Sequence, residues 1–210
     1  MSTYLLLAVL VVLLGVVLMQ LFKKQTPPKA APIQDLANLK VADARSGDVI
    51  SVAGLGDNMT DLDFTADRLI RCESGDRRWF ELSGPYRERR VALRVAEGEE
   101  TEVSLHADPR KLTLEDLGLS EEDLAEMDQR QNTADSFEFD SKVWLYRLSR
   151  EVQATREDQW QPAGYYYWEF QEQDGKRLLA VRKPEGEPFA VTLYTAIPAA
   201  DVTVFRGAGV

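Results

Sequence analysis

The chain contains nearly the same 29-residue pattern twice, and this repetition constrains the fold more than any other feature. Residues 79–107 align with residues 167–195 at a constant offset of 88, without a gap. Nine aligned positions are identical, and they include the Glu-Gly-Glu turns at residues 97–99 and 185–187. Because many other positions keep apolar or aromatic character, the pattern predicts an internal duplication.

Each copy has the alternation of β-strands. In the first copy Val91, Leu93 and Val95 alternate with small or charged residues, and a second alternating run follows the turn. Gly98 and Gly186 lie between the runs, where we predict turns with positive φ. Each copy is therefore expected to be an antiparallel meander of about three strands, which is too small to be stable without the other.

Further strand patterns flank the repeats, namely GDVISV, DRLIRCE, FEFDSKVWLYRLSREV and PAADVTVF. Ser120 and Asp123 have the spacing of a capping box and predict one helix of about ten residues. The sequence thus predicts a mainly β fold, with two related antiparallel halves joined by a short helical connector, packed as a sandwich or a barrel. The expected segments are a transmembrane helix (1–22), a linker containing Pro and Lys (23–40), a first β-rich half (41–107), the helical connector (108–135) and a second β-rich half (136–210).

An apolar run over residues 4–22 opens the chain, with Gln20 as its one polar interruption. At about 1.5 Å per residue its length is about 28 Å, close to the hydrocarbon thickness of a bilayer. No Lys or Arg precedes the run and no clear cleavage site follows it, which favours a membrane anchor over a cleaved signal peptide. Lys23 and Lys24 follow the run, so the positive-inside rule predicts a cytoplasmic body.

The body is strongly acidic. The first 40 residues hold four Lys and one Asp, so residues 41–210 hold 21 basic and 34 acidic residues, a net charge of −13. Such a body is repelled by anionic lipids and by phosphates, so we expect no nucleic-acid partner. The acidity provides solubility in one interpretation and attracts a cationic small molecule in the other.

Few residues have the type and spacing of a catalytic or metal site. Cys72 is the single cysteine, which excludes an internal disulfide, and His106 is the single histidine, which excludes a two-histidine metal site. The alternation predicts Cys72 as a small buried residue and His106 on an outer strand face. Residues 57–63 lack the Gly and Glu of a calcium loop and are interpreted as an acidic loop. We therefore predict no catalytic residue, no metal and no cofactor.

Aromatic and basic residues on the polar faces of the strands are the candidate partner surface, and we expect them to point outward. These residues are Trp79, Tyr165, Tyr167, Arg94 and Arg182. Arg94 is also expected to pair with Glu81 on the adjacent strand and so to fix the register. The second copy repeats this arrangement with Arg182 and Glu169.

Several stretches together resemble a bacterial family catalogued as domain of unknown function 4178. They are GDVISV, RRWFEL followed by RRVALRV, the connector LTLEDLGLSEEDL, and YYYWEF before EGEPFAVTLY and DVTVF. The resemblance covers the chain from about Leu36 to Phe205 and implies a β-rich fold, with no assigned activity and no catalytic residues. Similar families tend to be encoded near aminopropyltransferase-like and small membrane proteins, which implies a membrane or polyamine-linked setting.

The sequence therefore favours a non-catalytic, membrane-tethered binding or scaffolding module. It is expected to cross the bacterial inner membrane once, to contact the lipid bilayer through residues 4–22, and to present a cytoplasmic domain to a protein partner. The alternative is an enzyme or sensor that acts on a cationic small molecule such as a polyamine.

Overall fold

The computed structural model describes residues 39–159, 161–173 and 175–207. The chain is mainly β, with one short α-helix and four 3₁₀ turns among these residues. The strands are β1 (Val49–Val52), β2 (Leu62–Thr65), β3 (Arg68–Ser74), β4 (Arg77–Tyr86), β5 (Arg89–Glu97), β6 (Glu102–His106), β7 (Ser136–Phe139), β8 (Lys142–Arg156), β9 (Ala163–Glu172), β10 (Arg177–Pro184), β11 (Ala190–Ile197) and β12 (Val202–Phe205). The helices are η1 (Val41–Asp43), η2 (Asp57–Met59), η3 (Glu115–Leu117), α2 (Glu121–Arg130) and η4 (Ala199–Asp201).

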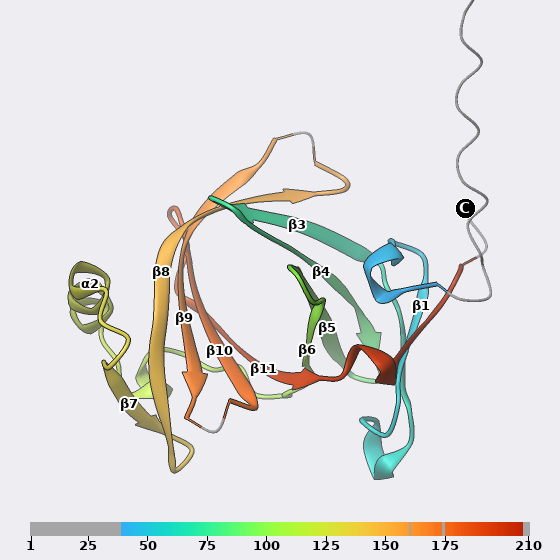
Figure 1. Cartoon of the computed structure of the whole chain (residues 1–210), viewed down its shortest axis with the longest axis horizontal. Coiled ribbons are helices and arrows are strands. Elements are labelled where there is room, and N and C mark those ends of the chain that lie inside the picture. Colours follow the sequence, from blue (N-terminus) through green and yellow to red (C-terminus); the bar gives the residue numbers. More distant parts are fainter. Residues whose placement is uncertain (1–38, 160, 174, 208–210) are drawn as a thin grey trace, which may run out of the picture. The chain divides into compact units, whose positions relative to one another are not determined.

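Eight strands close into an antiparallel barrel, which Figure 1 shows as a ring. Strands β3 to β6 form a first meander, and strands β8 to β11 form a second. The meanders meet at two antiparallel seams, β6 with β11 and β3 with β8. Of the two packings that the sequence left open, the chain thus adopts the barrel. The interior of an eight-stranded barrel is just wide enough to be filled by side chains.

A β-bulge in β8 moves its side chains from the outer face of the barrel to the lumen. The register with β9 shifts between Tyr146 and Leu148. Before the bulge, Trp144 and Tyr146 pack in the core outside the barrel. After it, Leu148 and Val152 pack in the lumen. The bulge therefore lets β8 pair near its start with β7, which is not part of the ring, and near its end with β3, which is.

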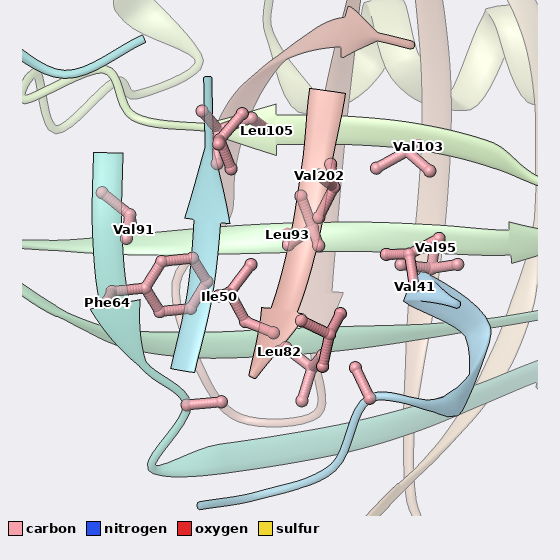
Figure 2. Close-up of a cluster of buried hydrophobic side chains, with 14 of the residues drawn as sticks. Val41, Ile50, Phe64, Leu82, Val91, Leu93, Val95, Val103, Leu105 and Val202 are labelled. Atoms are coloured by element: carbon pink, nitrogen blue, oxygen red, sulfur yellow. The ribbon is translucent and has the colours of Figure 1, made fainter. Parts of the chain in front are cut away.

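A three-stranded sheet, ordered β12-β1-β2, covers the outer face of the first meander. Figure 2 shows this core, where Leu82 and Leu93 of the meander meet Ile50 of β1 and Val202 of β12. Strand β12 belongs to the predicted second half but pairs with β1, so the end of the chain lies in the cover of the first meander. Residues 62 and 63, the end of the predicted acidic loop over residues 57–63, instead belong to β2, because its alternate apolar residues face this core.

The connector covers the outer face of the second meander, and Figure 1 shows α2 and β7 beside β8. Leu124 and Met127 are the buried residues of α2 and pack in this core with Trp168 of β9. The predicted capping box is confirmed, because Ser120 accepts from the amide of Asp123 and the Asp123 carboxylate accepts from the amide of Ser120. The two meanders therefore share a lumen and have separate outer cores.

The described residues all belong to one compact unit. The predicted anchor over residues 4–22 lies outside the described residues. Among the described residues, no helix combines the length and the apolar character needed to cross a bilayer.

Candidate functional site

The five residues predicted to form an outward partner surface point into the barrel instead. Trp79 is 5 % exposed and Tyr167 is 2 % exposed, and both belong to the lumen cluster against which Tyr165 also packs. The side chains of Arg94 and Arg182 are 12 % and 19 % exposed. The predicted orientation is wrong because the opposite, apolar face of these strands is buried under the outer covers, which leaves the polar face to line the lumen.

Ion pairs in the lumen join the two meanders. The Arg94 Nη2 of β5 donates to Glu169 Oε2 of β9 at 3.0 Å, and the Arg182 Nη2 of β10 donates to Glu81 of β4. The predicted pairing within each meander is therefore wrong. Glu81 does lie opposite Arg94 in the register, but Glu169 lies opposite Ala180. This shift of two residues carries Arg182 along its strand, away from Glu169.

Two aromatic contacts also join the meanders, one across the lumen and one at the β6–β11 seam, and each joins positions 88 residues apart. The ring centroids of Trp79 and Tyr167 are 5.8 Å apart, and those of His106 and Tyr194 are 5.9 Å apart. His106 Nδ1 donates to the carbonyl oxygen of Leu193 at 2.9 Å. The prediction of His106 on an outer face is thus wrong for the same reason as for the arginines, because its strand turns its apolar face to the outer sheet.

Each guanidinium of these ion pairs also lies over an aromatic ring. Arg94 lies 5.4 Å from the centroid of Trp79, and Arg182 lies 5.7 Å from that of Tyr165. Arg182 Nη2 donates a further hydrogen bond to the Tyr194 hydroxyl at 2.9 Å. The electron-rich faces of these rings stabilise a cation that has left bulk water.

The Glu81–Arg182 ion pair is charged. Burial acts to raise the pKa of Glu81, but the Arg182 guanidinium acts in the opposite direction and outweighs burial. The net pKa of Glu81 therefore lies below its ordinary value. Burial acts to lower the pKa of Arg182, but the Glu81 carboxylate raises it, and the net pKa lies well above its ordinary value. Each partner therefore holds the other in its ionised form.

The Cys72 thiol lies in the lumen and is 1 % exposed, which confirms the prediction of a small buried residue. Burial raises its pKa to about 12, and the Tyr165 hydroxyl donates to Sγ at 3.5 Å. A thiol with this pKa is protonated near neutral pH and is a poor nucleophile. Over the part of the chain that the structure describes, no group of three or more His, Cys, Asp or Glu side chains could hold a metal ion.

A groove of about 500 Å³ lies at the end of the barrel where β9 begins and β10 ends. We call it the rim groove. Tyr165 and Tyr166 are half-buried and form its wall with Pro184, which lies opposite Tyr165 in the register. Glu151 and Glu185 are exposed and line the same groove. The groove thus combines two tyrosines, whose side chains lie on opposite faces of β9, with two exposed carboxylates.

Tyr166 is held in place on the outer side of the barrel. The Tyr166 hydroxyl donates to Asp128 Oδ1 of α2 at 2.7 Å, and its ring centroid lies 4.7 Å from that of Trp168. Burial and this hydrogen bond raise the pKa of Tyr166 to about 12. Lys183 also lines the groove, with Nζ 4.5 Å from the ring centroid of Phe189. The groove is therefore shaped before any ligand arrives.

Of the rim-groove residues, the sequence predicted only Tyr165 as part of a binding surface. Pro184 ends β10 after an alternating run, and this was the available signal that the strand stops beside the tyrosines. The lumen had a signal too, because Ala96 and Ala180 share the face of the arginines. Small residues between long charged ones indicate a crowded interior better than they indicate a solvated surface.

No family model, no curated protein and no solved structure matches the chain.

Proposed function

We propose that this protein is a non-catalytic binding module whose partner contacts the rim groove. One observation carries the proposal. The arginines, glutamates and aromatic residues that recur in the two meanders contact one another inside the barrel and so are not free to bind a partner. The rim groove is a different kind of surface, since it is open and has exposed carboxylates beside Tyr166, which its hydrogen bond to Asp128 of α2 fixes. Concave sites with a few polar groups at an apolar wall are the usual form of ligand sites.

We further propose that the partner presents a cationic group. The carboxylates of Glu151 and Glu185 attract a cation, and they outnumber Lys183, the one basic residue among those that line the groove. The acidic body favours the approach of such a ligand over a long range. A basic segment of a protein partner is the first source of this group, and a free polyamine is the second.

The proposal includes a tether and an origin. Residues 4–22 anchor the module in the bacterial inner membrane with the body in the cytoplasm, supported by the apolar run and by Lys23 and Lys24. The body belongs to the family catalogued as domain of unknown function 4178 and arose by internal duplication. The duplication is supported by the aligned repeat, by the presence of two four-stranded meanders, and by the aromatic contacts between positions 88 apart.

The rim groove can be tested with two probes on residues 36–210. A lysine-rich peptide and spermidine are titrated separately in moderate salt, against wild type and against the double variant E151K/E185K. The control is E99K/E100K, which makes the same charge change at two exposed residues of the β5–β6 turn. We expect E151K/E185K to bind at least about tenfold more weakly than wild type, and the control to change by less than about twofold.

The two sources give different results in this experiment. Saturable binding of the peptide without spermidine supports the protein partner, and saturable binding of spermidine supports the small molecule. If neither probe binds, or if both double variants weaken binding equally, the groove is not the site. Topology is tested separately with a C-terminal reporter that is active only outside the cytoplasm, since a signal from it contradicts the proposed orientation.

A further inference from the structure

We infer that the barrel can also close between two copies of this chain, with the first part of one copy pairing with the second part of the other. The partner in this interaction is a second copy of the same protein. The inference rests on the division of the barrel and does not depend on what the rim groove binds.

The barrel divides into two bodies at the link between β6 and η3. Residues 39–106 contain β1 to β6, and residues 112–207 contain η3, α2 and β7 to β12. The core under the connector contains residues of the second body alone. Each meander is continuously hydrogen-bonded within its own body. Each body can therefore keep its own sheet and most of its outer core when the two separate.

The surfaces that join the bodies are reciprocal. The first body presents Arg94 to Glu169 of the second, and the second presents Arg182 to Glu81 of the first. The β3–β8 and β6–β11 seams add main-chain hydrogen bonds, and β12 adds another seam with β1. All these contacts are between groups that a second copy offers in the same arrangement, so a two-fold exchanged dimer contains the same set twice.

The link between the bodies is short, and its ion pair, ring contact and β-bridge to residues outside the link are with the second body. It runs from the end of β6 at His106 to Leu112, which bridges to Val191. Within it, Pro109 restricts the backbone, and Arg110 forms exposed ion pairs with its neighbour Asp108 and with the β7–β8 turn. Exposed ion pairs add little stability, so redirecting this link toward a second copy costs little compared with the seams it preserves.

The test uses charge exchange in the full chain, kept in detergent. One variant carries E81R/R94E and the other carries E169R/R182E. In each variant alone, like charges face each other across the lumen in both pairs. When the two are mixed, one barrel of an exchanged dimer has the wild-type pairs and the other has both pairs reversed, so every charge faces its opposite. The variant with all four substitutions is the matched control, because its charges match within one chain.

We expect each double variant refolded alone to give little folded protein, and an equimolar refolded mixture to give a folded dimer of twice the 23.7 kDa chain mass by light scattering. The variant with all four substitutions should fold as a monomer. If it folds and the mixture still gives no dimer, the inference is wrong. If the reversed lumen does not fold at all, wild-type chains of two isotopic compositions are refolded together at high concentration, and the absence of a mixed dimer by native mass spectrometry overturns the inference.

Discussion

The two meanders carry related groups on their lumen faces, but their outer faces meet unrelated covers. The lumen face of each meander must match the other meander, and both carry an arginine, a glutamate and an aromatic residue at aligned positions. The outer face must match whatever packs on it, a three-stranded sheet in one case and a connector with a helix in the other. The lumen face therefore keeps its charged and aromatic groups, and the outer face keeps its apolar character, with Val103 and Leu105 identical to Val191 and Leu193. The covers differ in what they require at single outer positions.

One aligned position shows this divergence. Gly84 of β4 lies where a Cβ would come within 2.0 Å of the carbonyl oxygen of Thr65 in β2. The aligned residue of the second meander is Glu172, whose carboxylate accepts from Arg177 at 2.8 Å. The first cover brings a backbone against the barrel and requires the smallest residue, whereas the second meander has room for a charged side chain at the same place.

Removal of one lumen charge is the largest expected effect on this comparison. Arg182→Met leaves the Glu81 carboxylate buried without its partner, and we expect it to lower the free energy of unfolding by about 3–5 kcal/mol. Arg94→Met should lower the free energy of unfolding by a similar amount, because it leaves the Glu169 carboxylate without its ion-pair partner. Urea denaturation of residues 36–210 measures both values. The double variant E81Q/R182M should recover part of the loss, and a single variant as stable as wild type would contradict the reciprocal arrangement.

The same lumen groups predict how stability depends on pH. The pKa of Glu81 is lowered in the folded state by Arg182, below its ordinary value of 4.5. A carboxyl group whose folded pKa is depressed contributes stability that is present above its unfolded pKa and is lost as the pH falls through the folded pKa. We therefore expect wild type to lose stability as the pH falls below about 4.5. A matched titration of E81Q should show a shallower loss, and parallel curves would exclude Glu81 as a cause.

The covers can be compared through their tightest contact. Gly84→Ala forces a methyl group against the backbone of β2, and we expect a loss of about 1–3 kcal/mol in the free energy of unfolding. Gly164→Ala is the matched control in the second meander, because its added Cβ meets only the flexible end of Gln153, at 3.4 Å. Thermal unfolding of both variants tests this. Equal losses would mean that the close approach of β2 to β4 is not specific to the first cover.

The sequence predicted the positions of the helix and strands better than it predicted which face of each strand points into the barrel. Alternation located the strands, and the Ser120 and Asp123 spacing located α2, because both depend on residues close together in the chain. Alternation states that two faces differ, but it does not state which face is inside a barrel. Both faces of these strands are buried, one by the covers and one by the other meander, so the polar residues of the lumen have the sequence pattern of an exposed surface.

Closure of the barrel and the rim groove depend on contacts between distant segments. Strand β10 is shifted by two residues against β9, which moves Arg182 toward Glu81. An alignment of the two repeats at a constant offset does not reveal this shift in strand pairing. The bulge that redirects β8 lies in an alternating run that reads as one regular strand. The groove forms only because the start of β9 and the end of β10 lie beside Glu151 of β8. These are properties of the assembled sheet rather than of any one stretch.

The smallest effect concerns the two Glu-Gly-Glu turns, which look alike in sequence and differ in conformation. Gly186 has φ +73°, and the amide of Glu187 donates to the carbonyl of Pro184 at 3.3 Å, as in a turn that requires a positive φ at its third residue. Gly98 is not among the glycines with positive φ, so that prediction is confirmed for Gly186 and wrong for Gly98.

Alanine substitution separates these two turns. Gly186→Ala places a Cβ in a left-handed conformation and should cost about 1 kcal/mol, although no atom lies within 4 Å of the added carbon. Gly98→Ala meets only the carbonyl oxygen of Glu100, at 3.3 Å, and should cost less than about 0.5 kcal/mol. Denaturant unfolding of the two variants under identical conditions measures the difference. Equal costs would mean that the turns share a conformation, and that the meanders differ at their covers but not at their turns.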